Sequence, residues 1–190
     1  QGSPYIIPVQ AVVPAGSTLT IEPGVVVKFD GPGNLTIQGN VHAVGNSAEE
    51  IIFTTVSDSS FGGDTTALAT TTPPQRFVQN QILVMSGGDF TLVFGKLLYN
   101  GFALGVDGGG DNIAFRPMIE NQGTLTITDS TIQDGLGSGL QNYLGDVVLR
   151  RSTFQNLPGD LVHLISGSTT ISEGIFKNGL TGIRQADGIL

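Results

Sequence analysis

The sequence predicts an all-β solenoid, and two observations carry this prediction. Three similar segments begin at Gly123, Gly145 and Gly167, 22 residues apart, and read GTLTITDSTIQD, GDVVLRRSTFQN and GSTTISEGIFKN. A fixed period of this size is typical of stacked repeats rather than of a single globular core. In addition, apolar and polar residues alternate in short runs, and no stretch carries a sustained 3.6-residue apolar pattern.

The first third of the chain reads as short strands separated by turns. In residues 11–29, AVVPAGSTLTIEPGVVVKF, prolines and glycines cut the β-branched runs into pieces. Residues 33–46, GNLTIQGNVHAVGN, use the same Leu-Thr-Ile core again, and residues 49–56, EEIIFTTV, form a further apolar strand. The repeating pattern therefore begins well before the three clean repeats.

Two interruptions break this pattern. Residues 57–81, rich in Gly and Thr and containing a Pro-Pro pair, predict an inserted loop, after which the strands resume over residues 88–106. Residues 107–122, which contain the stretch DGGGDN, predict a second inserted loop. We expect regular 22-residue turns over residues 123–190.

The clean repeats predict which side chains form the core. In the first repeat Leu125 and Ile127 alternate with threonines, so the aliphatic side chains point inward and the threonines outward. In register, Ile127 aligns with Leu149 and Ile171, Ile132 aligns with Phe154 and Phe176, and Leu140 aligns with Leu161 and Ile183. A polar column of Asp134, Asn156 and Asn178 predicts a turn in the left-handed conformation with a ladder of side-chain hydrogen bonds.

Composition excludes several classes of function. The chain has 190 residues and a formal net charge of −8, which disfavours nucleic acid as a partner. It contains no cysteine, so neither disulfides nor a thiolate metal site can form. No apolar run approaches the length of a membrane span, about 18 residues.

The stretches VPAGSTLTIEPGVVVKF, IIFTTVSD and GGDT, followed by units of the form G-x-L-T-I-x-x-S-x-I, resemble bacterial right-handed parallel β-helix repeat proteins. The resemblance implies a three-sided coil over residues 1–190 as a single domain, with residues 1–32 as an N-terminal cap. It also implies a secreted or cell-surface location, usually as one module of a longer chain. Because ADGIL (186–190) begins a further turn, we expect an open C-terminal end that other surface-protein domains or copies of the chain itself cover.

An enzyme is the main alternative, because parallel β-helices include pectin-type lyases and hydrolases. The Asn-Thr-Asp, Asp-Asp and Gly-His-Gly motifs of a polygalacturonase-like hydrolase are missing from the sequence, and the two histidines of this chain, His42 and His163, lie in apolar strand contexts. The column Asp129, Arg151, Glu173, again at 22-residue spacing, predicts a surface ladder of ion pairs. Its alternative interpretation is a calcium-dependent polysaccharide lyase, with Arg151 as the base and Asp129 as a metal ligand.

Two acidic loops are the candidate calcium sites. Carboxylates flank glycines at Asp58 and Asp64, and two carboxylates and an amide do so at Asp107, Asp111 and Asn112, which is the oxygen-rich setting that calcium prefers. Neither loop matches a known calcium motif, so solvated turns are the favoured interpretation. We expect a non-catalytic structural or adhesive module without cofactor, assembling end to end or within a longer surface protein. The alternative is a polysaccharide-binding coil whose groove uses these loops with Tyr99, Phe115 or Tyr143.

Overall fold

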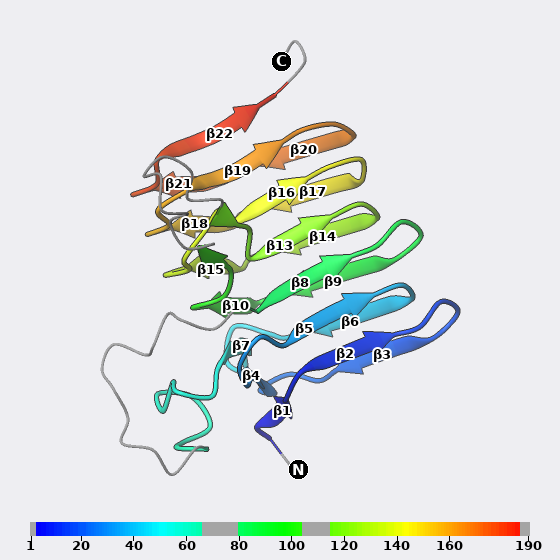
Figure 1. Ribbon diagram of the computed structural model, residues 1–190, viewed down its shortest axis with the longest axis vertical. Helices are drawn as coiled ribbons and strands as arrows, with labels where there is room; N and C mark the ends of the chain where they lie inside the picture. Colours follow the sequence, from blue (N-terminus) through cyan, green and yellow to red (C-terminus); the bar gives the residue numbers. More distant parts are fainter. Residues whose placement is uncertain (1–2, 66–79, 104–114, 187–190) are drawn as a thin grey trace, which may run out of the picture.

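The chain is a parallel β-solenoid with three walls (Figure 1). The computed structural model describes residues 3–65, 80–103 and 115–186, and within them every regular element is a strand. The chain visits the three walls in turn, so that within each wall a strand pairs in parallel with the wall strands of the adjoining turns. The all-β, three-sided coil expected from the sequence is confirmed. No helix in these ranges is long and apolar enough to cross a membrane.

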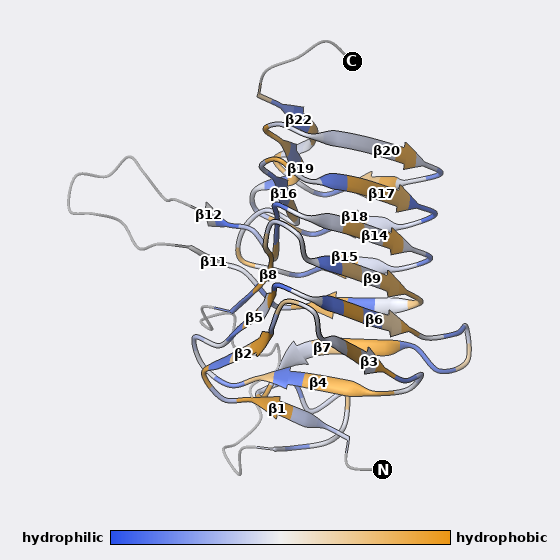
Figure 2. Cartoon of the chain, turned by 90° about the vertical axis from the view of Figure 1, so that its right-hand side faces the viewer, coloured by the Kyte–Doolittle hydropathy of each residue, from blue (hydrophilic) through white to orange (hydrophobic). Residues whose placement is uncertain are grey.

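The walls are named here by their order along the chain. Wall 1 contains β1 (Tyr5–Ile7), β4 (Val26–Phe29), β7 (Ile51–Thr55), β10 (Gly95–Leu98), β15 (Thr131–Gln133), β18 (Thr153–Gln155) and β21 (Ile175–Lys177). Wall 2 contains β2 (Gln10–Val13), β5 (Asn34–Ile37), β8 (Gln81–Val84), β13 (Ile119–Asn121), β16 (Leu140–Asn142), β19 (Asp160–Leu164) and β22 (Thr181–Gln185). Wall 3, whose strands are stacked one above another on the side facing the viewer in Figure 2, contains β3 (Thr18–Ile21), β6 (Asn40–Val44), β9 (Asp89–Val93), β14 (Thr124–Thr128), β17 (Asp146–Arg150) and β20 (Ser168–Ser172).

The predicted core columns are present. Leu125 and Ile127 are fully buried, whereas the threonines between them face outward. Ile127 pairs with Leu149, which pairs with Ile171, so like residues lie on like residues at the strand spacing of about 4.8 Å. In wall 1 the rings of Phe154 and Phe176 stack with centroids 5.7 Å apart and an interplanar angle of 22°. These columns form one continuous apolar core along the coil.

One predicted register is wrong. Leu140 pairs with Val162 rather than with Leu161, and Val162 pairs with Ile183, so the spacings are 22 and then 21 residues. The shorter step therefore lies between β19 and β22, one turn later than the sequence suggested. Both Leu161 and Val162 are buried. Because the two aliphatic residues are adjacent, the alternation of inward and outward side chains does not determine which of them pairs with Leu140.

The expected insertions also need adjustment. β13 lies within residues 107–122, yet it is a full member of wall 2, paired with β8 on one side and β16 on the other. The antiparallel pair β11 (Phe102–Ala103) and β12 (Phe115–Arg116) forms the base of this insertion. The first insertion, expected over residues 57–81, ends before Gln81, where β8 begins. Residues 1–32, expected as a cap, contain β1, β2 and β3, which make the first turn of the coil, and β4, which begins the second turn.

Candidate functional site

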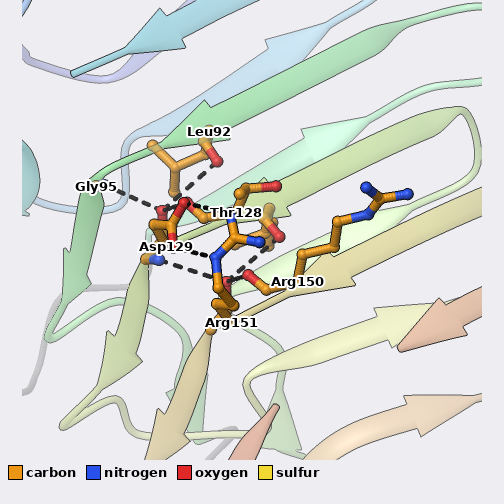
Figure 3. A network of polar contacts seen from close by, with 9 residues as sticks. Leu92, Gly95, Thr128, Asp129, Arg150 and Arg151 are labelled. Atoms are coloured by element: carbon orange, nitrogen blue, oxygen red, sulfur yellow. Dashed lines mark hydrogen bonds and ion pairs between the residues drawn. The ribbon is translucent and has the colours of Figure 1, made fainter. Parts of the chain in front are cut away.

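The column Asp129, Arg151, Glu173 lies at the corner where wall 3 leads into wall 1 (Figure 3). All three residues have left-handed backbone angles, with φ of 51°, 45° and 55°. The Asp129 N–H donates to the carbonyl of Arg150, and the Arg151 N–H donates to that of Ser172. The corner therefore repeats the same turn in successive rungs, and the side chains stack because the backbone does.

Asp129 and Arg151 form a two-pronged ion pair. Nε of Arg151 donates to Oδ1 at 2.6 Å, and Nη2 donates to Oδ2 at 2.7 Å. The hydrogen bond from Arg151 lowers the pKa of Asp129, and the same bond, helped by the charges of Asp129 and Glu173, raises the pKa of Arg151. A general base must be deprotonated before it can accept a proton from the substrate. An arginine whose pKa is raised stays protonated, so Arg151 is poorly suited to be the base of a lyase. The surface ion-pair interpretation fits the geometry.

A serine ladder lies directly behind this corner. Ser130 and Ser152 follow Asp129 and Arg151 and are almost completely buried. The Ser130 hydroxyl accepts the Gly95 N–H at 3.0 Å and donates to the Thr128 carbonyl at 2.7 Å. The Ser152 hydroxyl accepts the Ser130 N–H at 3.3 Å. The repeated serine was visible in the sequence, but its role in satisfying backbone groups at the corner was not predicted.

A second buried ladder, also missed, lies at the corner between walls 2 and 3. Nδ2 of Asn121 donates to Oδ1 of Asn142 at 2.9 Å, and both side chains are fully buried. Nδ2 of Asn142 in turn donates to the carbonyls of Gly145 and Ser166, while its Oδ1 accepts the Gly145 N–H. These two asparagines are 21 residues apart and so do not fall in one column of the 22-residue repeat, which is why the ladder was not predicted.

The predicted polar column at the corner between walls 1 and 2 is confirmed. Asp134, Asn156 and Asn178 each have a φ of 56°. Nδ2 of Asn156 donates to Oδ1 of Asp134 at 3.1 Å, and Nδ2 of Asn178 donates to Oδ1 of Asn156 at 2.9 Å. All three corners of the coil are thus held by side chains that bond to the next turn.

The first acidic loop already holds a cation of the chain itself. Nζ of Lys28 donates to the carbonyls of Asp58 at 2.8 Å and Gly63 at 2.6 Å, and the lysine is fully buried on the outer face of wall 1. Desolvation lowers the pKa of Lys28, opposed by the charges of Asp58 and Asp64. The Asp58 carboxylate accepts bonds from the Thr54 hydroxyl at 2.7 Å and the Ser60 N–H at 3.0 Å. The ammonium thus lies where the calcium interpretation would put a metal ion.

The other candidate residues do not converge in the described part of the chain. Asp107, Asp111 and Asn112 lie outside the described residues. Tyr99 follows β10 and Tyr143 follows β16, so the two tyrosines lie at different corners, and Phe115 lies in β12. Across residues 3–65, 80–103 and 115–186, no group of three or more His, Asp or Glu side chains is placed to hold a metal ion.

Exposed apolar residues occur at both ends of the described coil, and also at Val44 and Leu144 in its interior turns. At the N-terminal end an apolar cavity of about 400 Å³ opens between the first turns, lined by inward side chains that include Tyr5, Leu19, Ile21, Val27 and Phe53. At the C-terminal end Ile175, Leu180 and Ile183 are 54%, 74% and 40% exposed. The open C-terminal end stays a prediction, because residues 187–190, most of the stretch ADGIL on which it rests, lie outside the described residues.

Comparison with known proteins found no matching family model, no matching curated protein and no matching solved structure.

Proposed function

We propose that this chain is a non-catalytic structural or adhesive module of a secreted or cell-surface protein. In this proposal the coil serves as a rigid spacer, wound in the right-handed sense that parallel crossover connections almost always have. Its partners are other domains of a surface protein or further copies of the chain, which meet it at the ends of the coil.

The observation that supports this proposal most strongly is that the polar columns form hydrogen bonds between neighbouring turns. Arg151 bonds Asp129, Ser130 bonds Ser152 and Asn142 bonds Asn121, each across one turn. The polar side chains of these columns, including the candidate base Arg151 and the candidate metal ligand Asp129, therefore hold neighbouring turns together. In a stacked repeat, such contacts between neighbours supply the stability of the array.

Polysaccharide assays test this proposal against the lyase alternative. The chain is incubated with polygalacturonate and with neutral polysaccharides, with calcium or with a chelator, and both binding and the ultraviolet absorbance of unsaturated products are followed. We expect no product, and no binding difference between Arg151→Gln and its matched control Arg150→Gln, an exposed neighbour on the outer face of wall 3. The proposal would be overturned if the wild-type chain formed product in a calcium-dependent reaction, and if Arg151→Gln abolished this activity while Arg150→Gln retained it.

A further inference from the structure

We propose that the N-terminal end of the coil binds the C-terminal end of a second copy of this chain, head to tail. The proposal rests on the structural function above and names its partner. Within the described residues, β1, β2 and β3 at one end and β21, β22 and β20 at the other have a strand neighbour on one side only. In the described part of the chain, each end thus shows three strand edges to which further parallel strands could pair.

The N-terminal end has room for side chains from a partner. Its cavity of about 400 Å³ is apolar and lies between inward-facing residues of the first turns, with Tyr5 and Leu19 among the lining. A cavity of about 150 Å³ already holds a benzene molecule. The space at this end therefore suits one aromatic and more than one aliphatic side chain arriving together.

The C-terminal end presents such side chains at matching positions. The wall 1 column that begins at Tyr5 passes through Phe53 and ends at Phe176. The wall 3 column runs from Ile21 to Ile171. A second copy in the same register would place Phe176 over Tyr5 and Ile171 over Ile21.

Wall 2 continues in the same way. Its column runs from Ala11 through Leu35 and Leu140 to Ile183, so the small Ala11 would receive the larger Ile183. The junction between copies thus repeats the contact that each turn makes with the next inside the chain. This continuity favours a second copy over an unrelated apolar ligand as the occupant of the cavity.

A contact between two different surfaces of the same chain does not close on itself unless the copies form a ring. Straight stacking along the coil axis therefore extends into a filament. Pairing of exposed sheet edges supplies main-chain hydrogen bonds, and the apolar columns supply the register.

Two lysine substitutions test the head-to-tail arrangement by sedimentation velocity over a range of concentrations. Leu19→Lys charges the N-terminal end and Ile183→Lys charges the C-terminal end, at side chains that are 39% and 40% exposed and so tolerate the change. We expect wild-type chains to form a concentration-dependent series of species, and each variant alone to stay monomeric. Their mixture should stop at a 1:1 dimer, because one intact N-terminal end and one intact C-terminal end remain. Thr126→Lys, on the outer face of β14, is the matched control and should assemble as the wild type does.

Other outcomes would overturn the proposal. A single 19.7 kDa species at every wild-type concentration would exclude a second copy as the partner. Dimers of Leu19→Lys alone would show that like ends bind each other instead. Neither result bears on the structural function, which the polysaccharide assay tests separately.

A disulfide trap checks the register. The chain has no cysteine of its own, and the outward column from Thr20 ends at Thr170. A chain carrying Thr20→Cys and Thr170→Cys should form covalent oligomers under mild oxidation, because facing residues on paired strands lie within disulfide reach. The control pairs Thr20→Cys with Ser168→Cys, two residues out of register and beyond that reach. Equal cross-linking of the two pairs would contradict the register.

Discussion

Replacement of Phe154 by alanine measures how the coil distributes its stability. The side chain is fully buried in wall 1, between Ile132 of the preceding turn and Phe176 of the following turn. Removing a buried phenylalanine costs about 3–5 kcal/mol of unfolding free energy. Domains of this kind have about 5–15 kcal/mol in total, so Phe154→Ala should consume a large part of the stability.

Phe176→Ala is the matched comparison, because both residues belong to one column and stack on each other at 5.7 Å. Within the described residues, Phe176 has a strand neighbour on one side only, and its side chain is partly exposed. If stability is a sum over neighbouring turns, we expect about half the cost of Phe154→Ala, or about 2 kcal/mol.

The assay is urea unfolding followed by far-ultraviolet circular dichroism, at concentrations low enough to keep the chain monomeric. Similar slopes for wild type and both variants would allow the free energies to be compared directly. Equal costs for the two substitutions, or a larger cost for Phe176→Ala, would refute the nearest-neighbour reasoning.

Three further predictions concern the buried asparagine ladder, the lysine in the acidic loop and the surface ion pair. Asn142→Ala leaves the buried amide of Asn121 without its partner and should lower the free energy of unfolding in urea by about 2–4 kcal/mol. The matched change at an exposed position, Asn178→Ala, should alter this free energy by no more than about 0.5 kcal/mol. Equal costs would argue against the buried ladder. Burial lowers the pKa of Lys28, so the unfolded chain binds the proton of this ammonium group more tightly than the folded chain does. Wild type should therefore gain stability relative to Lys28→Met as pH rises toward about 10.4, the ordinary lysine value. An unchanged difference in stability across that range would contradict this linkage. Arg151→Gln should cost less than Asn142→Ala. Because the hydrogen bond from Arg151 lowers the pKa of Asp129, the loss should shrink at high salt, and also as pH falls from about 3.9, the ordinary aspartate value, through the lower pKa of the paired carboxylate. A loss independent of both salt and pH would contradict the ion-pair explanation.

Most of the fold could be predicted from the 22-residue repeat, because its period and the alternation of apolar and polar residues are local properties of the sequence. Leu125 and Ile127 could be placed in the core, and Asp134 in a left-handed turn, from spacing alone. The register of β19 was beyond this reasoning, since Leu161 and Val162 are equally apolar and both buried. Only the pairing with neighbouring strands distinguishes them.

The candidate site depended on contacts that spacing does not reveal. Lys28 and the loop around Asp58 are thirty residues apart, and nothing in either stretch indicates that the lysine enters the loop. Asn121 and Asn142 are separated by a step of 21 residues, so they fall outside a strict 22-residue column. By contrast, the pairing of Asp129 with Arg151 follows directly from the period, and the sequence predicted it.

Fibre diffraction from a concentrated, aligned preparation tests most directly whether this coil builds structure by stacking on itself. The strand spacing of about 4.8 Å runs along the axis of the coil, and head-to-tail assembly makes that axis the filament axis. We therefore predict filaments with a 4.8 Å reflection on the meridian. Filaments with this reflection on the equator, or a solution that stays monomeric at every concentration, would contradict head-to-tail stacking of the coil.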